Sequence, residues 1–242
     1  MTETVTLLDG KVIANQPASG FRSGLDAVLL GASIAMKPGE LAIEFGCGTG
    51  GAMLVAAHHN PDARFLGIDA DAAVIGLAES NIAANGWTER MHAICGDIGA
   101  SASQPPAGQV FFNPPFYDDE TALKPPAAGK RSAYLSGDAP LEAWIGQANK
   151  ALKPKGRLTL IHRADRLDDI LAIARRWFGD VAIKPVASYS DRPAKRVLVS
   201  ARKGVKSPMK LLPPLVLHDG PDRKYAPAAD AILRGRARLA VT

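Results

Sequence analysis

The residues best suited to chemistry in this chain form the tetrapeptide Asn113-Pro114-Pro115-Phe116, which directly follows the apolar residues 110–112. Proline has no backbone donor and restricts the residue before it, so Asn113 and Pro114 are both expected to be extended. Such a corner is stiff, and it directs polar atoms and an aromatic ring at one place. A simpler interpretation is that the two prolines only end a strand.

A glycine-rich stretch, EFGCGTGG at residues 44–51, forms a second candidate site. Its glycines allow a tight turn and the close approach of a ligand to the backbone. Asp69 lies 23 residues after Gly46, at the expected end of the next strand, where an acid can bind both hydroxyls of a ribose. Asp97, after a third strand, could bind the amine of an adenine ring or cap a helix. The pattern predicts a nucleoside ligand, and because residues 46–51 also fit GxGxxG, a nicotinamide dinucleotide competes.

Strand and helix patterns alternate along the chain and must position both candidate sites. Short apolar runs predict strands at 41–45, 64–69, 91–97, 109–113, 156–162, 181–188 and 195–202. Helical spacing predicts helices at 25–36, 52–59, 71–86, 140–153, 165–178 and near 227–234, and a hairpin is expected at 6–14 with its turn at Asp9-Gly10. This order predicts an α/β fold. We expect a Rossmann-like, doubly wound, mainly parallel seven-stranded sheet with helices on both faces, plus an N-terminal hairpin and helix extension.

The expected organisation has three parts. Residues 1–38 would form an N-terminal extension packed on the main domain, residues 39–205 the main ligand-binding domain, and residues 206–242 a C-terminal extension. The longest irregular stretch, residues 114–138, follows the fourth strand, and a loop of this length is typical of a functional segment. In an open parallel sheet, ligands bind at the carboxyl ends of the strands, where both candidate sites fall.

Composition excludes several classes of protein. The chain of 242 residues is 47% hydrophobic and 22% charged, which is typical of a globular protein. No apolar run approaches the roughly 20 residues of a membrane span, and the N-terminus does not have the pattern of a signal peptide. The two cysteines, Cys47 and Cys95, make neither a disulfide framework nor a zinc set. We therefore expect a cytoplasmic protein without a metal or a membrane partner.

Charge is distributed unevenly along the chain. Residues 1–150 contain 9 Lys and Arg against 16 Asp and Glu, whereas residues 151–242 contain 20 against 8, a net charge of +12. Such asymmetry indicates a basic surface for a polyanion, although basic side chains can also simply solvate helix faces. The candidate substrate contacts are Lys195 and Arg196 at a closing strand, with Lys130 and Arg131 in the long loop.

Four stretches together resemble the class I S-adenosylmethionine-dependent methyltransferases: EFGCGTG (44–50), GIDAD (67–71), GD (96–97) and NPPF (113–116). The upstream FRSGLDAVLLGAS (21–33) and the terminal LHDGPDRKYAPAADAIL (217–233) resemble the bacterial tRNA(Val) adenine-N6 methyltransferase family. The chain departs from the usual pattern in Glu44, where Asp is more common, and in Phe116, where Tyr is common. Phe116 has no phenolic hydroxyl, so any role for one is excluded.

The resemblance implies S-adenosylmethionine as the cofactor and S-adenosylhomocysteine as its product. It also implies that Phe21, Arg22 and Asp26 close over the cofactor, although these residues equally suit an ordinary helix start. The cofactor-binding residues expected are Glu44, Phe45, Gly46, Cys47, Gly48, Gly50, Asp69, Ala70, Asp97, Ile98, Asn113, Arg22 and Asp26; those expected to be catalytic are Asn113, Pro114, Pro115 and Phe116.

The resulting hypothesis is an enzyme that methylates the exocyclic amine of an RNA base, foremost adenine-N6 in tRNA. The side-chain oxygen of Asn113 and the carbonyl of Pro114 would accept the N–H bonds of the amine, and Phe116 would stack on the base. The alternatives are a protein glutamine N-methyltransferase, whose planar amide suits the same acceptors, and a protein that binds cofactor or RNA without chemistry. A nicotinamide-dependent dehydrogenase ranks last because no catalytic acid is apparent. The oligomeric state stays open.

Overall fold

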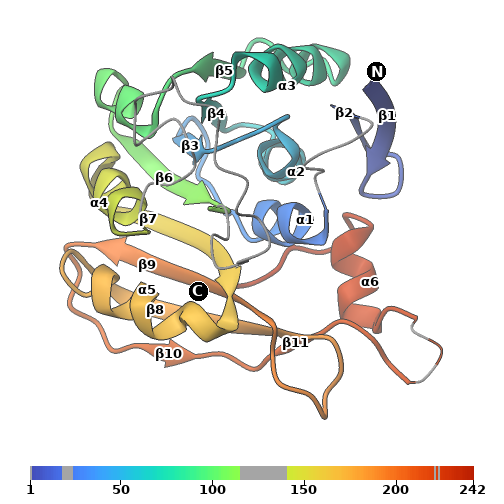
Figure 1. The fold of residues 1–242 in the computed structure, drawn as a ribbon, viewed down its shortest axis with the longest axis vertical. Coiled ribbons are helices and arrows are strands. Elements are labelled where there is room, and N and C mark those ends of the chain that lie inside the picture. The colour runs from blue at the N-terminus through green and yellow to red at the C-terminus, as the bar shows by residue number, and fades with distance from the viewer. Residues whose placement is uncertain (1, 18–23, 115–140, 221, 223) are drawn as a thin grey trace, which may run out of the picture.

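The computed structural model describes residues 2–17, 24–114, 141–220, 222 and 224–242. A nine-stranded sheet forms its centre, in the order β10-β8-β9-β7-β6-β3-β4-β5, with β11 also paired to β8 (Figure 1). Every pairing is parallel except those of β9 with β7 and β8. The strands are β3 (Leu41–Phe45), β4 (Arg64–Asp69), β5 (Met91–Cys95), β6 (Ala107–Phe112), β7 (Leu152–Arg163), β8 (Phe178–Ala187), β9 (Arg196–Lys203), β10 (Lys210–Leu211) and β11 (Leu215–Val216). The mainly parallel α/β sheet is confirmed: its seven long strands are those expected, and two short strands of the C-terminal extension join its edge.

Helices cover both faces of the sheet because the side chains of each strand alternate between the faces. The helices are α1 (Leu25–Ala32), α2 (Gly51–His59), α3 (Ala72–Ala84), α4 (Leu141–Ala151), α5 (Leu167–Ala174) and α6 (Pro227–Leu233), with short helical turns η1 (Ile98–Ser103) and η3 (Ala164–Arg166). On β3, Ala42 packs in a core with α1, α2 and α3, while the next residue, Ile43, packs in the core with α4 and α5. Among the described residues, no helix is long and apolar enough to cross a membrane.

Some expected boundaries were wrong. The helix expected at 165–178 ends at Ala174, and β8 already begins at Phe178, because Phe178 and Gly179 pair with β9. Antiparallel pairing therefore overrides the helical periodicity at this point. The expected hairpin at 6–14 is longer than expected, with β1 at Thr2–Leu7 and β2 at Val12–Pro17.

The hairpin is attached to α3 by two asparagines. The N–H of Asn15 donates to the side-chain oxygen of Asn81 (2.6 Å), and the N–H of Ile13 donates to that of Asn85 (3.0 Å). Asn81 also donates to the carbonyl oxygen of Thr49, inside the glycine-rich turn. Side chains of α3 thus form hydrogen bonds with the backbone of β2 at its open edge, and Asn81 connects the hairpin to the candidate site.

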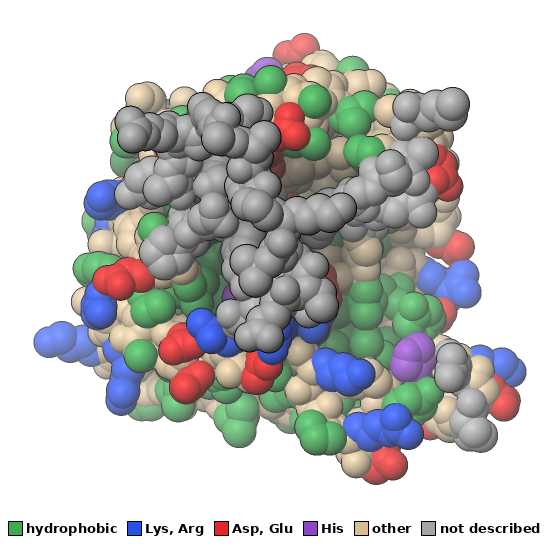
Figure 2. Space-filling view, viewed as in Figure 1, with side chains coloured by type: hydrophobic (Ala, Val, Ile, Leu, Met, Phe, Trp, Pro, Cys, Tyr) green, Lys and Arg blue, Asp and Glu red, His purple; other side chains and the backbone are tan. Residues whose placement is uncertain are grey.

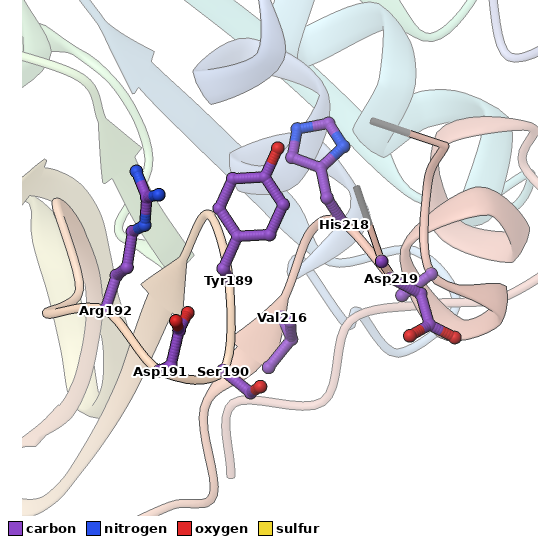
Figure 3. A pocket seen from close by; sticks show the side chains of 9 residues that line it. Tyr189, Ser190, Asp191, Arg192, Val216, His218 and Asp219 are labelled. Carbon is purple, nitrogen blue, oxygen red and sulfur yellow. The ribbon is translucent and has the colours of Figure 1, made fainter. Parts of the chain in front are cut away.

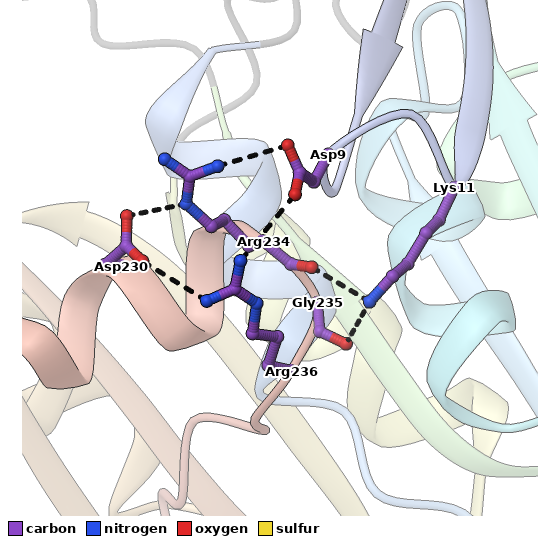
Figure 4. Close-up of polar contacts among 6 residues, drawn as sticks. All are labelled: Asp9, Lys11, Asp230, Arg234, Gly235 and Arg236. Carbon is purple, nitrogen blue, oxygen red and sulfur yellow. Dashed lines mark hydrogen bonds and ion pairs between the residues drawn. The ribbon is translucent and has the colours of Figure 1, made fainter.

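A polar cluster joins the N-terminal hairpin turn to the C-terminal extension (Figure 4). Arg234 donates to Asp230 (2.8 Å) and to Asp9 (3.1 Å), and Leu8 lies buried beneath Gly235. The members of the cluster are Asp9, Lys11, Asp230, Arg234, Gly235 and Arg236. Both extensions contribute to one core with α1 and α2, so the expected division at residues 38 and 205 stays a prediction.

Candidate active site

The glycine-rich turn and Asn113 lie side by side because the strand order reverses between β3 and β6. From β3 the chain proceeds outward to β4 and β5, and then returns to place β6 on the other side of β3. Phe45, the last residue of β3, is in register with Phe112, the last residue of β6. Gly46 and Asn113 therefore leave the sheet next to each other, at the switch point where ligands of open α/β sheets bind.

Two glycines of the turn have separate roles. Gly46 and Gly48 both adopt left-handed backbone conformations, with φ of 61° and 53°. A Cβ on Gly46 would lie 2.8 Å from the ring of Trp144, whereas a Cβ on Gly48 would meet nothing within 4 Å. Gly46 thus allows close packing against α4, and Gly48 leaves the backbone open to a ligand.

Asp69 fastens the turn to the end of β4. Its Oδ2 accepts from the N–H of Gly48 (2.8 Å), and its Oδ1 accepts from the N–H of Asp71 (3.0 Å). Each carboxylate oxygen has a second lone pair, so these bonds leave capacity for hydroxyl donors. Ala70 follows, and its carbonyl oxygen faces the thiol of Cys95.

Glu44 carries an unpartnered oxygen in the interior. Glu44 is 4% exposed, and within the described part of the chain its Oε2 atom has no hydrogen-bond partner. Burial raises the pKa of Glu44 well above its ordinary value; the N–H of Met53, in the first turn of α2, opposes this rise, and the charge of Asp69 adds to it. A buried acceptor without a donor is costly, so this oxygen is suited to a cationic ligand group.

Asn113 presents a second unpartnered acceptor. Its Oδ1 atom is buried and has no hydrogen-bond partner among the residues that the structure describes. Pro114, the next residue, is buried. Pro115 and Phe116 lie outside the described residues, so the structure covers only half of the tetrapeptide.

An aromatic cluster supports this edge of the sheet. The rings of Phe45 and Phe112 stack with centroids 6.2 Å apart, and Trp144 lies 5.4 Å from Phe112. Phe45 is fully buried in this cluster, so only its backbone can face a ligand. Sequence reasoning missed Trp144, whose buried Nε1 has no hydrogen-bond partner among the described side chains and backbone. Its only signal was an apolar position in the expected helix at 140–153.

Three more expected cofactor residues have structural roles. Asp97 caps η1 by accepting from the N–H of Gly99 (2.6 Å). A helix cap was one of the two roles expected for it, beside binding of an adenine amine. Ile98 is buried in the core beside α4. Cys47 fills the space beside Gly67, where a Cβ would lie 2.7 Å from its sulfur, and burial raises the pKa of its thiol well above the ordinary value.

Asp26 and Arg196 bind each other, although the sequence assigned them to different ligands. The Nε of Arg196, at the start of β9, donates to Oδ2 of Asp26 in α1 (2.9 Å). Lys195 is exposed in the loop between β8 and β9. Phe21, Arg22, Lys130 and Arg131 lie outside the described residues. Within the described part of the chain, no group of three or more His, Cys, Asp or Glu residues could hold a metal ion.

Comparisons with known proteins show the family to which the chain belongs. The family model described as "Methyltransferase small domain" matches residues 25–183. A tRNA1(Val) (adenine(37)-N6)-methyltransferase of Dickeya chrysanthemi is 30% identical over 223 residues, covering 87% of this chain and 85% of that protein. The corresponding enzyme of Porphyromonas gingivalis is 34% identical over 194 residues, covering 76% and 75%.

A solved structure has the same fold. It is described as a predicted O-methyltransferase of Agrobacterium tumefaciens and matches with a TM-score of 0.74 at 22% identity, covering 89% of this chain and 98% of that one. The matched family region includes the glycine-rich turn, Asp69 and Asn113. The chain therefore belongs to the methyltransferase small domain family, as an S-adenosylmethionine-dependent methyltransferase of the group that includes these two relatives.

Proposed function

We propose that this protein transfers a methyl group from S-adenosylmethionine to the N6 amine of an adenine in tRNA. The observation that carries the proposal is the buried, unpartnered side-chain oxygen of Asn113, one residue beyond β6 at the switch point. Such an oxygen suits a donor that arrives with the substrate, because a buried acceptor left unpaired is costly. The adenine-N6 names of the relatives support an RNA base as the source of that donor.

The residues at the edge of the sheet fit the proposed cofactor. Glu44 Oε2 suits a positively charged amino group, and Gly48 offers open backbone beside it. Asp69 has lone pairs for ribose hydroxyls, and Asp97 with Ile98 would border the adenine ring. When bound, S-adenosylmethionine supplies a methyl group on a sulfonium centre, ready for in-line displacement.

The protein's own contribution to catalysis is to orient the amine. An exocyclic amine is a poor nucleophile because its lone pair is delocalised into the ring. If the side-chain oxygen of Asn113 and the carbonyl of Pro114 accept its two N–H bonds, the lone pair turns out of the ring plane. Prolines 114 and 115 restrict the backbone, so the acceptors need no rearrangement during the reaction. No base is required beforehand, since the methylated cation loses its proton readily.

The basic second half of the chain would position the RNA. Figure 2 shows Lys and Arg side chains over the lower part of the molecule, where β8, β9 and β11 lie in Figure 1. Exposed Lys195 is one candidate phosphate contact. Arg196 is a weaker one than its charge suggests, because it is paired with Asp26. The target base would have to leave its stack, which is easiest in a loop.

Replacement of Asn113 tests the proposal. Asn113→Ala should lower the turnover of tRNA methylation by about 100- to 1000-fold, the usual effect of removing one preorganised polar partner. Affinity for S-adenosylhomocysteine should change little, because the lost bond is made to the amine. Asn113→Asp keeps an acceptor oxygen at the same place and should retain more activity than Asn113→Ala. The measurement is mass spectrometry of nucleosides from treated tRNA, with calorimetry for the cofactor.

Two results would count against the proposal. Full activity in Asn113→Ala would mean that Asn113 only ends a strand. Methylation of a glutamine in a protein, with unmodified tRNA left untouched by the wild type, would favour the protein glutamine alternative.

A further inference from the structure

A pocket of about 640 Å³ lies between the β8–β9 loop and the C-terminal extension, away from the glycine-rich turn. The side chains that matter for its chemistry are those of Tyr189, Asp191, Arg192, His218 and Asp219. Figure 3 shows Tyr189, Arg192 and His218 side by side, extending in the same direction from two different segments. From the sequence, Arg192 was expected only as one of several basic residues that could follow a phosphate backbone, and the other four residues had no assigned function.

The pocket lies beside a stack of flat groups, of which Tyr189, Arg192 and His218 line it and Tyr225 adjoins it through His218. The ring of His218 stacks on that of Tyr225 (centroids 5.1 Å apart, 18° between planes) and lies 5.5 Å from that of Tyr189. The guanidinium of Arg192 lies over Tyr189, 5.1 Å from its centroid. Tyr225 is 46% exposed, and His218 Nδ1 is buried with no hydrogen-bond partner in the described ranges of the chain. The stack therefore offers exposed aromatic surface together with an unused polar atom.

Sheet topology places this pocket on the same edge as the candidate active site. β8 and β11 are parallel, with Val216 opposite Ala187, so Tyr189 and His218 both follow carboxyl ends of strands. Between β6, which ends before Asn113, and β8 lie β7 and β9. Three strand spacings of about 4.8 Å put the two positions roughly 14 Å apart across the sheet. Phe112 is level with Ile183 in the strand registers, so Tyr189 also lies roughly 16 Å further along the strand direction than Asn113, and the two positions are roughly 22 Å apart. A short run of single-stranded nucleic acid along this edge would span that distance.

The charges of the pocket select the kind of ligand. Two carboxylates, Asp191 and Asp219, line it with one guanidinium, that of Arg192. Without an excess of positive charge, the lining is poorly suited to a phosphate. Flat stacking surfaces with hydrogen-bond acceptors suit a nucleobase, which has a π-face and N–H groups on its edge.

We propose that this pocket binds an unstacked base of the substrate RNA, a few nucleotides from the methylated adenine. The proposal rests on the proposed function, since it takes the substrate to be RNA. The pocket would hold the strand at a second point, so that the target base is presented to Asn113 in a fixed register. It would thereby select RNAs with an accessible base at this distance from the target.

Two substitutions and a matched control test the pocket. Tyr225→Leu removes a half-exposed ring, and Arg192→Gln removes the stacked cation. Arg176→Gln is the control, because Arg176 also lies over an aromatic ring, Trp177, but just before the amino end of β8 and thus at the opposite edge of the sheet. The probe is an anticodon-arm RNA with 2-aminopurine placed at one loop position after another, since the fluorescence of this base falls when it stacks.

When 2-aminopurine stands at one loop position other than that of the target adenine, binding of the wild type or of Arg176→Gln should quench its fluorescence. Binding of Tyr225→Leu should not. KM for tRNA should rise by about 5- to 150-fold in Tyr225→Leu and Arg192→Gln, the range that alanine substitution gives for stacking of one base. Tyr225→Phe should restore both readouts, and affinity for S-adenosylhomocysteine should stay unchanged in all variants.

The outcomes separate this inference from the proposed function. If wild type methylates tRNA but neither pocket variant alters quenching or KM, the pocket inference alone is overturned. Equal loss of S-adenosylhomocysteine binding in the pocket variants would also overturn it, since the residues would then support the cofactor site. If wild type methylates a protein glutamine and no RNA, both proposals fail.

Discussion

The unpartnered carboxylate oxygen of Glu44 makes cofactor binding dependent on pH. Burial raises the pKa of Glu44 well above its ordinary value, so the side chain takes up a proton more readily in the folded protein than in the unfolded chain. An ammonium group of the cofactor would favour the ionised form. Binding should therefore release a proton from Glu44 wherever the side chain is protonated in the free protein, and affinity should rise with pH over that range.

The expected change in affinity follows from the loss of one hydrogen bond to the cofactor. A hydrogen bond to a charged group contributes about 1.5–3 kcal/mol, so Glu44→Gln should weaken S-adenosylhomocysteine binding by about 10- to 150-fold. For the wild type, affinity should increase by up to about tenfold per pH unit below the folded-state pKa of Glu44. For Glu44→Gln, this dependence should be absent.

Stability of the free protein should change in the opposite sense. Because the folded-state pKa of Glu44 is raised, its contribution to the free energy of unfolding is fully present below the unfolded-state pKa. It is lost as pH rises through the folded-state pKa. Glu44→Gln removes this loss, so the variant should gain stability over the wild type as pH rises. Less affinity together with more stability would distinguish a binding role from a packing role.

Calorimetry from about pH 5 to about pH 9, in buffers of different ionisation enthalpy, counts the released proton; urea unfolding at the same values measures stability. Glu40→Gln is the matched control, since Glu40 precedes β3 at its opposite end and pairs with Lys153. It should leave affinity unchanged. Equal, pH-independent affinity in wild type and Glu44→Gln would refute the reasoning.

Two further predictions concern the supports of the site. Gly46→Ala should lower the free energy of unfolding by about 1–3 kcal/mol in urea titrations, because its Cβ would lie 2.8 Å from Trp144 at a left-handed φ. Gly76→Ala, in helix α3 with nothing within 4 Å, should instead raise it by about 0.5–1 kcal/mol, and equal effects would contradict the packing argument. Arg196→Glu should lower the free energy of unfolding, because it places two acids together, and adding Asp26→Arg should recover most of the loss. If a double-mutant cycle shows no coupling between the two positions, the ion pair does not contribute to stability.

Local patterns in the sequence determined the main elements and the family. Strands β3 and β4 begin and end at the predicted residues, because each is a short apolar run bounded by turn residues. The turn glycines and the NPPF tetrapeptide could be recognised in the sequence for a similar reason, because a left-handed turn and a rigid corner need particular residue types at adjacent positions. Predictions on residues 115–140, including Phe116, Lys130 and Arg131, stay predictions.

Tertiary structure alone decided which distant residues meet. Asp26 and Arg196 are 170 positions apart, and no periodicity relates them. The packing of Trp144 beneath Gly46, and of the C-terminal extension against β8, depends on how the sheet brings strand ends together. The same edge unites Tyr189 with His218 in a pocket. A local pattern specifies a residue's own conformation, whereas its neighbours across the fold follow from strand order, which only the assembled sheet defines.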